Sequence, residues 1–150
     1  MVEGIELLFP QLQDAEWGVT SKPDDVYNCI AWAANVTTDW WWPVGPGRTY
    51  WPEGVRREAT LDAFRELFTT LGYEVCADEK LEPGFEKIAI FADDQGFPTH
   101  AARQLASGRW TSKLGKLEDI EHDLPALAGV EYGSIAIVMS RATIQSQTLG

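Results

Sequence analysis

The segment YNCIAWAANV, residues 27–36, is the clearest start of a helix in the first part of the chain. A Pro-Asp-Asp turn at residues 23–25 precedes it, and Asn28 is a residue type that accepts backbone N–H groups as a helix N-cap. The segment therefore predicts a helix that begins near Cys29. Because its side chains are apolar on nearly all faces, we expect the helix to be buried, with only its N-terminal end at a cleft.

The rest of the chain predicts a single α+β domain over residues 1–150, with N-terminal helices packed on a mostly antiparallel sheet. Prolines and glycines in residues 37–54 (TTDWWWPVGPGRTYWPEG) favour a long aromatic loop. A second helix is expected after Thr60, with apolar residues at helical spacing and Gly72 as its end. Alternating or apolar runs predict strands at 73–76, 87–92, 99–105, 109–113 and a buried final strand at 133–141. A short helix is expected at 119–128.

Composition excludes several classes of protein. The 150 residues are 45% apolar and carry a net charge of −11, which argues against binding nucleic acid or an anionic membrane. The N-terminus lacks the cationic and long apolar regions of a signal peptide, and no run of about 20 apolar residues could span a bilayer. A cytoplasmic protein, or one exported without a classical signal peptide, is expected. Two cysteines leave a single disulfide open.

Cys29 and His100 are the residues best placed for nucleophilic chemistry. A thiol in the first turn of a helix is near free N–H groups that favour the thiolate. His100 begins a predicted strand, whereas His122 lies in the acidic stretch 118–123 (EDIEHD), where a charged, solvated imidazole is expected. So few Cys and His residues disfavour a zinc site, and no cofactor is expected. Cys29 as a small core residue and His100 as a merely hydrogen-bonded strand residue remain the simpler interpretations.

The segment around Tyr27-Asn28-Cys29, followed about seventy residues later by His100 and a hairpin, resembles the papain-like cysteine hydrolases, most closely the NlpC-like amidase branch. The resemblance implies that Cys29 is the nucleophile and His100 the base of an enzyme acting on amide bonds of a peptide, protein or peptidoglycan stem. The third polar residue of that branch falls at Ser112, where the family usually has His, Asn or Gln. The phrases YNCIAWAAN, PTHAARQL and RWTSKLG also resemble a family of small uncharacterised bacterial proteins over the whole chain.

The implied mechanism is an attack of the Cys29 thiolate on an amide or ester carbonyl, with the proton taken up by His100. The Cys29 backbone N–H is one expected oxyanion donor, and the side chain of Asn28 or Gln104 is another. Water would complete a hydrolysis and an amine would complete an acyl transfer, and both outcomes stay open.

The aromatic loop and a basic hairpin surround these candidates. Trp41, Trp42 and Trp51 are expected to wall the substrate cleft, although large side chains in such a loop also serve to fix its conformation. Residues 100–117 hold four basic residues and no acid, so Arg103 and Lys113 are candidates for binding a substrate carboxylate. The same residues could instead be solvated strand faces paired with acids elsewhere.

A second class of function is a non-catalytic, acidic binding protein, similar to an immunity protein or antitoxin, that uses the aromatic loop as its interface. It predicts exposed tryptophans in one patch and a Cys29 sulfur distant from His100.

Overall fold

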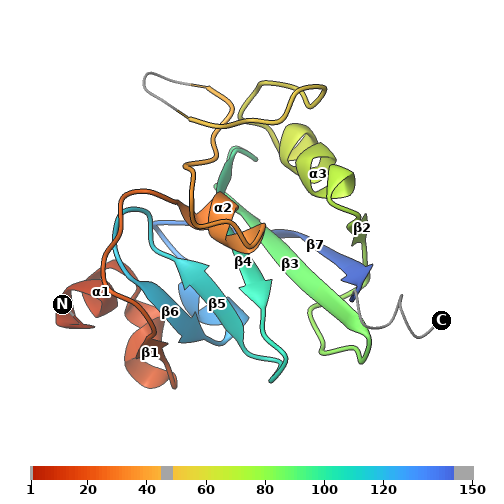
Figure 1. Ribbon diagram of the computed structural model, residues 1–150. Helices are drawn as coiled ribbons and strands as arrows, with labels where there is room; N and C mark the ends of the chain where they lie inside the picture. The colour runs from red at the N-terminus through yellow and green to blue at the C-terminus, as the bar shows by residue number, and fades with distance from the viewer. Residues whose placement is uncertain (1, 45–48, 144–150) are drawn as a thin grey trace.

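The computed structural model describes residues 2–44 and 49–143 and contains a seven-stranded sheet, shown in Figure 1. The strands lie in the order β1-β6-β5-β4-β3-β7-β2, and each hydrogen-bonded pair is antiparallel. Their bounds are β1 Gly18–Val19, β2 Glu74–Val75, β3 Phe85–Ala92, β4 Pro98–Gln104, β5 Trp110–Lys113, β6 Asp119–His122 and β7 Ser134–Ala142. The predicted α+β class and the antiparallel sheet are confirmed.

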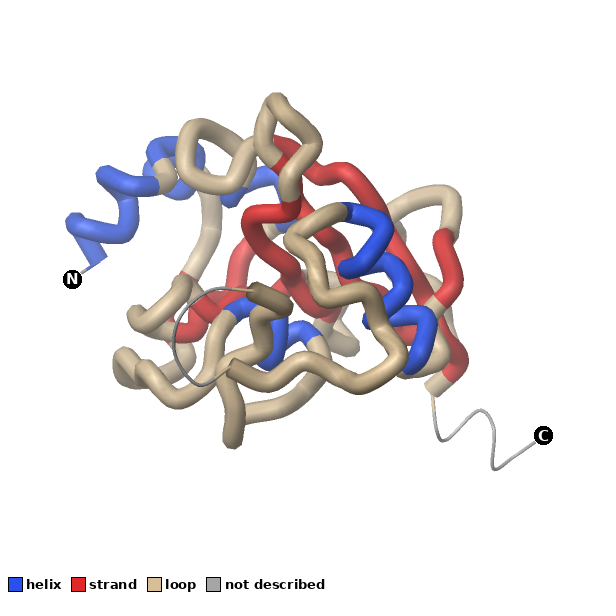
Figure 2. The backbone as a smooth tube through the Cα atoms, turned by 90° about the horizontal axis from the view of Figure 1, so that it is seen from above, coloured by secondary structure: helices blue, strands red, loops and turns tan. Residues whose placement is uncertain are grey.

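Helices cover both faces of this sheet, as the view in Figure 2 shows. One hydrophobic cluster lies between the sheet and two helices, α2 (Cys29–Ala33) and α3 (Leu61–Thr70). A second cluster lies between the opposite face and three N- and C-terminal segments, which are α1 (Val2–Leu8), η1 (Pro10–Asp14) and η2 (Leu124–Leu127). The chain therefore forms three layers, with the sheet in the middle.

Strand β3 lies between β4 and β7 and supplies side chains to both clusters. Ile88 and Ile90 belong to the cluster under α2 and α3, while Ala89 and Phe91 belong to the opposite one. Successive side chains of a strand point to opposite faces, so a strand buried on both sides must be apolar at every position. The run IAIF in β3 meets that requirement.

Helix α2 begins where the sequence predicts, directly after Asn28. The Asn28 Oδ1 accepts hydrogen bonds from the backbone N–H of Ala31 at 3.2 Å and of Trp41 at 3.0 Å, and Nδ2 donates to the carbonyl of Trp41 at 2.8 Å. The side chain thus caps the helix and fixes the start of the aromatic loop. The helix ends before Asn35, which has a positive φ of 65°.

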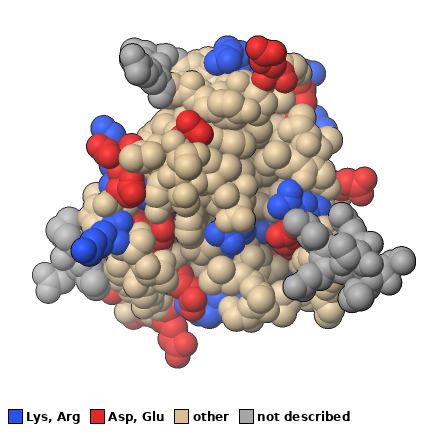
Figure 3. Space-filling model, viewed as in Figure 1, with Lys and Arg blue, Asp and Glu red and all other residues tan. Residues whose placement is uncertain are grey.

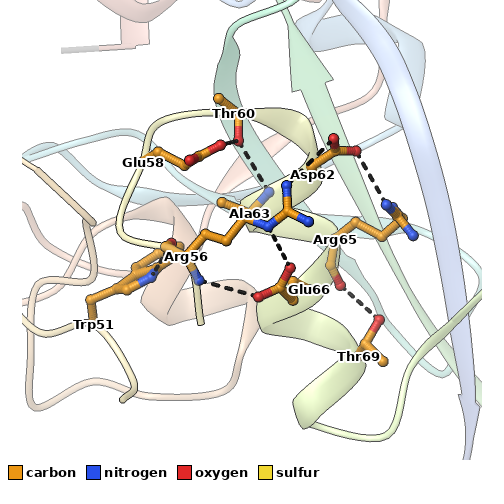
Figure 4. A network of polar contacts seen from close by, with 9 residues as sticks. All are labelled: Trp51, Arg56, Glu58, Thr60, Asp62, Ala63, Arg65, Glu66 and Thr69. Atoms are coloured by element: carbon orange, nitrogen blue, oxygen red, sulfur yellow. Dashed lines mark hydrogen bonds and ion pairs between the residues drawn. The ribbon is translucent and has the colours of Figure 1, made fainter. Parts of the chain in front are cut away.

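Helix α3 is also confirmed, with Thr60 Oγ1 as its N-cap at 3.2 Å from the Ala63 amide. Figure 4 shows how its exposed side holds the end of the aromatic loop: the Arg56 Nε lies 3.1 Å from a carboxylate oxygen of Glu66. The Trp51 indole N–H donates to the carbonyl of Arg56 at 2.8 Å. The loop is therefore fixed at both ends, although residues 45–48 lie outside the described residues.

Three predicted features differ from the structure. The helix expected at 119–128 is instead strand β6 followed by the short 3-10 helix η2, because β6 pairs in register with β5 from Trp110↔His122 to Lys113↔Asp119. The final strand β7 is less buried than expected, with Met139 its only fully buried residue. Finally, α1, η1 and β1 were not foreseen in the N-terminal segment.

Candidate active site

Cys29 lies at the first position of α2 and is 7% exposed. It opens into a pocket of about 330 Å³ whose walls come from the start of α2, the aromatic loop, β4, the turn that follows β5 and the turn that precedes β7. The pocket is lined by Asn28, Cys29, Trp40, Trp42, Thr99, Gly115 and Tyr132. Cys29 and Cys76 are both free thiols, so the disulfide left open by the sequence does not form. Of the two, only Cys29 lines this pocket.

The thiol of Cys29 is neutral in the resting protein, contrary to the expected thiolate. Burial raises its pKa to about 11, more than offsetting the hydrogen bonds from the backbone amides of Ala101, Ile30 and Cys29 itself and the field of Lys113, which lower it. A helix of five residues supplies only a small dipole, whereas burial disfavours the charged sulfur. The amide of Ala101 nevertheless shows that the sulfur lies against the backbone of β4, one residue beyond His100.

His100 is completely buried in the middle of the molecule. The ring of Tyr132 is stacked on its imidazole, with centroids 4.0 Å apart and planes 9° apart, and the ring of Phe91 meets it edge-on at 5.4 Å. Desolvation, and next to it the neighbouring His122, hold the pKa of His100 well below 6.5. Its imidazole is therefore neutral near pH 7 and fixed in one orientation.

A chain of hydrogen bonds runs from His100 across two further strands. The Nε2 of His100 lies 2.9 Å from the Oγ of Ser112 on β5, and this oxygen lies 2.8 Å from the Nε2 of His122 on β6. The Nδ1 of His122 lies 2.7 Å from the carbonyl oxygen of Asp123. Ser112 and His100 are thus brought together as expected from the resemblance.

The expectation of a charged, solvated His122 is wrong. Its side chain is completely buried, and burial lowers its pKa to about 4 although Asp123 acts in the opposite direction. The acidic neighbours Glu121 and Asp123 point elsewhere and form ion pairs with Arg109 at 3.0 and 2.9 Å. In a strand, alternate side chains face opposite sides, so neighbours in the sequence are poor guides to a residue's surroundings.

The other ring nitrogen of His100, Nδ1, has no hydrogen-bond partner among the described residues. No hydrogen bond joins it to Cys29 in this structure, although Tyr132 both stacks on the His100 ring and lines the Cys29 pocket. Catalytic hydrogen bonds are often long before substrate binds. The arrangement combines a buried imidazole with one nitrogen free of partners and a buried thiol that receives hydrogen bonds from backbone N–H groups, with Tyr132 in contact with the first and lining the pocket of the second.

Neither side chain expected to stabilise an oxyanion is placed for it. Asn28 lines the pocket, but its amide is held by α2 and Trp41. Gln104 lies at the other end of β4, where its Nε2 donates to the carbonyl of Glu79 at 2.9 Å. There it lines a larger hollow of about 660 Å³ whose walls hold no cysteine or histidine. Backbone amides at Cys29 are the donors that remain.

Some tryptophans of the aromatic loop are buried inside the molecule, and others line the Cys29 pocket. Trp51 is 3% exposed and packs on Phe64 of α3, and Trp41 is 7% exposed beside Tyr50. Trp42 is half-buried, touches Phe64 edge-on and lines the Cys29 pocket. Of the three expected cleft residues, only Trp42 reaches the cleft, where Trp40 joins it.

The basic residues expected to bind substrate are held by the protein itself. The Arg103 guanidinium stacks 5.0 Å over the Trp32 ring and donates to the Trp32 carbonyl. Lys113 is fully buried, with its ammonium over the Tyr27 ring and donating to the carbonyls of Asp24 and Gly115. On the face drawn in Figure 3, side chains of both charges lie in scattered clusters, and most of the surface between them is uncharged.

Sequence reasoning missed Tyr132 and the role of His122. Tyr132 lies in a Gly-flanked turn, GVEYG, and neither its sequence position nor its neighbours connect it with β4. A signal for His122 existed: residues 119–122 alternate acid, Ile, acid, His, and this pattern of period two places His122 beside Ile120 on the buried face.

Fold and site together define an α+β protein with an antiparallel sheet, a cysteine at the start of α2 and two buried histidines on β4 and β6. A family model named Domain of unknown function (DUF7689) matches residues 18–140, and the chain belongs to this family. Searches of curated proteins and of solved structures found no match. In the part of the chain described here, no helix has the length and apolar character needed to cross a membrane.

Proposed function

We propose that this chain is a papain-like cysteine hydrolase or acyltransferase that acts on amide bonds of a peptide, a protein or a peptidoglycan stem. Cys29 is the nucleophile and His100 the base. The observation that supports this most is the environment of His100, which is fully buried, hydrogen-bonded to Ser112 through Nε2 and without a partner at Nδ1 among the described residues. The residue after it on β4, Ala101, donates its backbone N–H to the Cys29 sulfur.

An unpartnered nitrogen in a buried ring is costly, since a buried polar atom without a hydrogen bond loses about 1–3 kcal/mol. Nearly all buried polar atoms in proteins have partners, and each exception calls for an explanation, of which a catalytic role is one. Among the described residues five buried polar side-chain atoms have no partner, and Nδ1 of His100 is the only imidazole nitrogen among them. The free Nδ1 therefore favours a catalytic role over a structural one.

The reaction balances with these groups alone. His100 Nδ1 takes the proton of the Cys29 thiol as the sulfur attacks the carbonyl carbon, and the carbonyl oxygen becomes an oxyanion facing the Cys29 backbone N–H. The imidazolium then gives its proton to the leaving nitrogen, the C–N bond breaks, and a thioester remains. Water or an amine, deprotonated by His100, attacks the thioester and restores the thiol. Because both groups are neutral at rest, the proton moves only when a carbonyl is in place.

The pocket suits an uncharged, flat or apolar group beside the scissile bond. Its walls are the rings of Trp40, Trp42 and Tyr132, and no charged side chain lines it. The alternative, an immunity- or antitoxin-like binding protein, needs tryptophans gathered on the surface. The burial of Trp41 and Trp51 gives that alternative no support, and it stays a prediction.

The proposal is tested with fluorogenic peptide amides and purified peptidoglycan stem peptides, with products followed by fluorescence and mass spectrometry. Cys29→Ala is compared with Cys76→Ser, a matched variant that removes the other, half-buried thiol. We expect a loss of more than about 100-fold in Cys29→Ala and little change in Cys76→Ser. Activity retained in Cys29→Ala would rule out the mechanism.

A further inference from the structure

We propose that His122 is a positioning residue, which acts through Ser112 to hold His100 in its Nε2–H tautomer and so keeps Nδ1 of His100 unprotonated. This inference rests on the proposed function for its purpose, but the tautomer itself follows from hydrogen bonds alone. It assigns His122 a role that neither the sequence nor the family match suggests.

The chain of hydrogen bonds has a defined direction because its far end is a backbone carbonyl. The oxygen of Asp123 can only accept, so the Nδ1 of His122, 2.7 Å away, carries the proton and donates it. In a neutral imidazole only one nitrogen is protonated, so the Nε2 of His122 is then a bare acceptor.

Neutral His122 is enforced by its surroundings. It is fully buried and shares its hydrogen-bond chain with His100. The charged groups that act on it are Arg109, which disfavours a positive imidazole, and Asp123, which favours one. The carboxylate of Asp123 is exposed and paired with Arg109, so burial prevails.

The next two bonds follow in turn. The Nε2 of His122 accepts from the hydroxyl of Ser112, since Oγ lies 2.8 Å away and this nitrogen has no proton to give. The Ser112 hydroxyl has then used its only proton, so its oxygen accepts from the Nε2–H of His100 at 2.9 Å. The remaining nitrogen of His100, Nδ1, must be unprotonated. It is the same nitrogen that has no partner among the described residues.

The stacked ring of Tyr132 prevents the imidazole of His100 from rotating out of these hydrogen bonds. With the rings 4.0 Å apart and nearly parallel, and Phe91 against the edge, a rotation of the His100 ring would displace both neighbours. The Thr99 hydroxyl donates to the Tyr132 carbonyl at 2.5 Å and ties this turn to β4. Ring plane and tautomer are therefore fixed separately, the first by packing and the second by hydrogen bonds.

The test is the nitrogen-15 NMR spectrum of the full-length protein, labelled at histidine and recorded at pH 7.5. Protonated and bare imidazole nitrogens resonate far apart, and the two histidines are assigned from single variants. We expect opposite tautomers, His100 protonated at Nε2 and His122 protonated at Nδ1. The same tautomer in both residues, or a proton on Nδ1 of His100, would overturn the proposal.

Variants then test whether the relay is the cause. Ser112→Ala is expected to shift the His100 tautomer ratio toward Nδ1–H by about fivefold or more, the effect of losing one hydrogen bond. Ser112→Thr keeps the hydroxyl and should restore the wild-type ratio. Thr111→Val removes a buried hydroxyl from the same strand, one that bonds to Trp32 rather than to a histidine, and should leave the ratio unchanged.

An unchanged ratio in Ser112→Ala would show that packing alone sets the tautomer and would contradict the inference. The readout is also separate from catalysis. If the tautomers are as expected but Cys29 proves inert toward acyl donors, the relay stands and the proposed function fails. If Cys29 is reactive but Nδ1 of His100 carries the proton, the relay fails and Nδ1 is not the proton acceptor, while Cys29 keeps its role as the nucleophile.

Discussion

At Cys29 two opposing effects act on the thiol. Amides of α2 and of Ala101 stabilise a negative sulfur, while the loss of water destabilises it, and the second effect is larger. The thiol is therefore neutral near pH 7, and it becomes a strong nucleophile only when a base removes its proton during the attack. This differs from a site with a preformed thiolate, in which the sulfur is reactive toward any small electrophile.

The pH dependence of alkylation distinguishes these two states. In Cys76→Ser protein, the rate of Cys29 alkylation by iodoacetamide should keep rising above pH 9, because the pKa of Cys29 is raised to about 11. A free cysteine has a pKa of about 8.5. Mass spectrometry of quenched samples gives the rate. A plateau reached below pH 8 would show a thiolate at neutral pH and would contradict the burial argument.

Asn28 is expected to contribute more to stability than an ordinary helix cap. Asn28→Ala removes an N-cap, worth about 1 kcal/mol, together with both bonds to Trp41, so we expect a loss of about 2 kcal/mol or more in urea unfolding. Thr60→Ala removes only the cap of α3 and should cost about 1 kcal/mol. Equal losses would mean that the clamp on the aromatic loop contributes nothing.

At the scale of elements, the sequence predicts helices and strands that have local signals. Asn28 and Thr60 mark their helices correctly, and the hairpin around Gly108 follows from its turn residues. The stretch 119–128, expected to be a short helix interrupted by Pro125, instead forms β6 and η2. The competing signal, pairing of Asp119 to His122 with β5, depends on a partner strand that local periodicity does not reveal.

The candidate site was only partly predictable for the same reason. Cys29, His100 and Ser112 lie on elements whose starts are visible in the sequence. The contributions of His122 and Tyr132 depend on the sheet order β6-β5-β4 and on a turn that crosses the sheet, both of which are long-range. The burial of Lys113 and Arg103 could not be foreseen because it follows from aromatic rings supplied by α2 and the segment before it.

The turn that carries Tyr132 should tolerate no side chain at Gly133. This glycine has a φ of +75°, and an added Cβ would lie 2.0 Å from the Ala92 carbonyl oxygen. We expect Gly133→Ala to cost about 3 kcal/mol or more. Gly96→Ala, at a similar φ of +83° but with nothing within 4 Å, should cost only about 1–2 kcal/mol. Urea unfolding measures both, and similar losses would contradict the crowding at Gly133.

For the whole molecule, the two buried histidines make stability depend on pH. Folding holds the pKa of His122 at about 4 and that of His100 well below 6.5, so the unfolded chain takes up protons first as the pH falls. Their stabilising contribution is complete above pH 6.5 and is lost progressively toward pH 4. Each should cost about 2 kcal/mol between pH 7.5 and pH 5.

Urea unfolding at these two pH values measures that loss. Burial raises the pKa of Asp119, so this carboxyl group acts in the opposite direction to the histidines as the pH falls. His122→Phe should remove about half of it, because one titrating group is gone. A stability that does not change between pH 7.5 and pH 5 would show that the histidines are accessible to protons in the folded protein.

The central claim is that His100 activates Cys29 toward a carbonyl group. The most direct test is the rate of acetylation by 4-nitrophenyl acetate, with acid quenching and mass spectrometry of the peptide that contains Cys29. We predict a single acetyl thioester on Cys29 in the wild type and a rate at least about 100-fold lower in His100→Asn. An equal rate in both proteins, or no acetyl group on Cys29, would contradict the account.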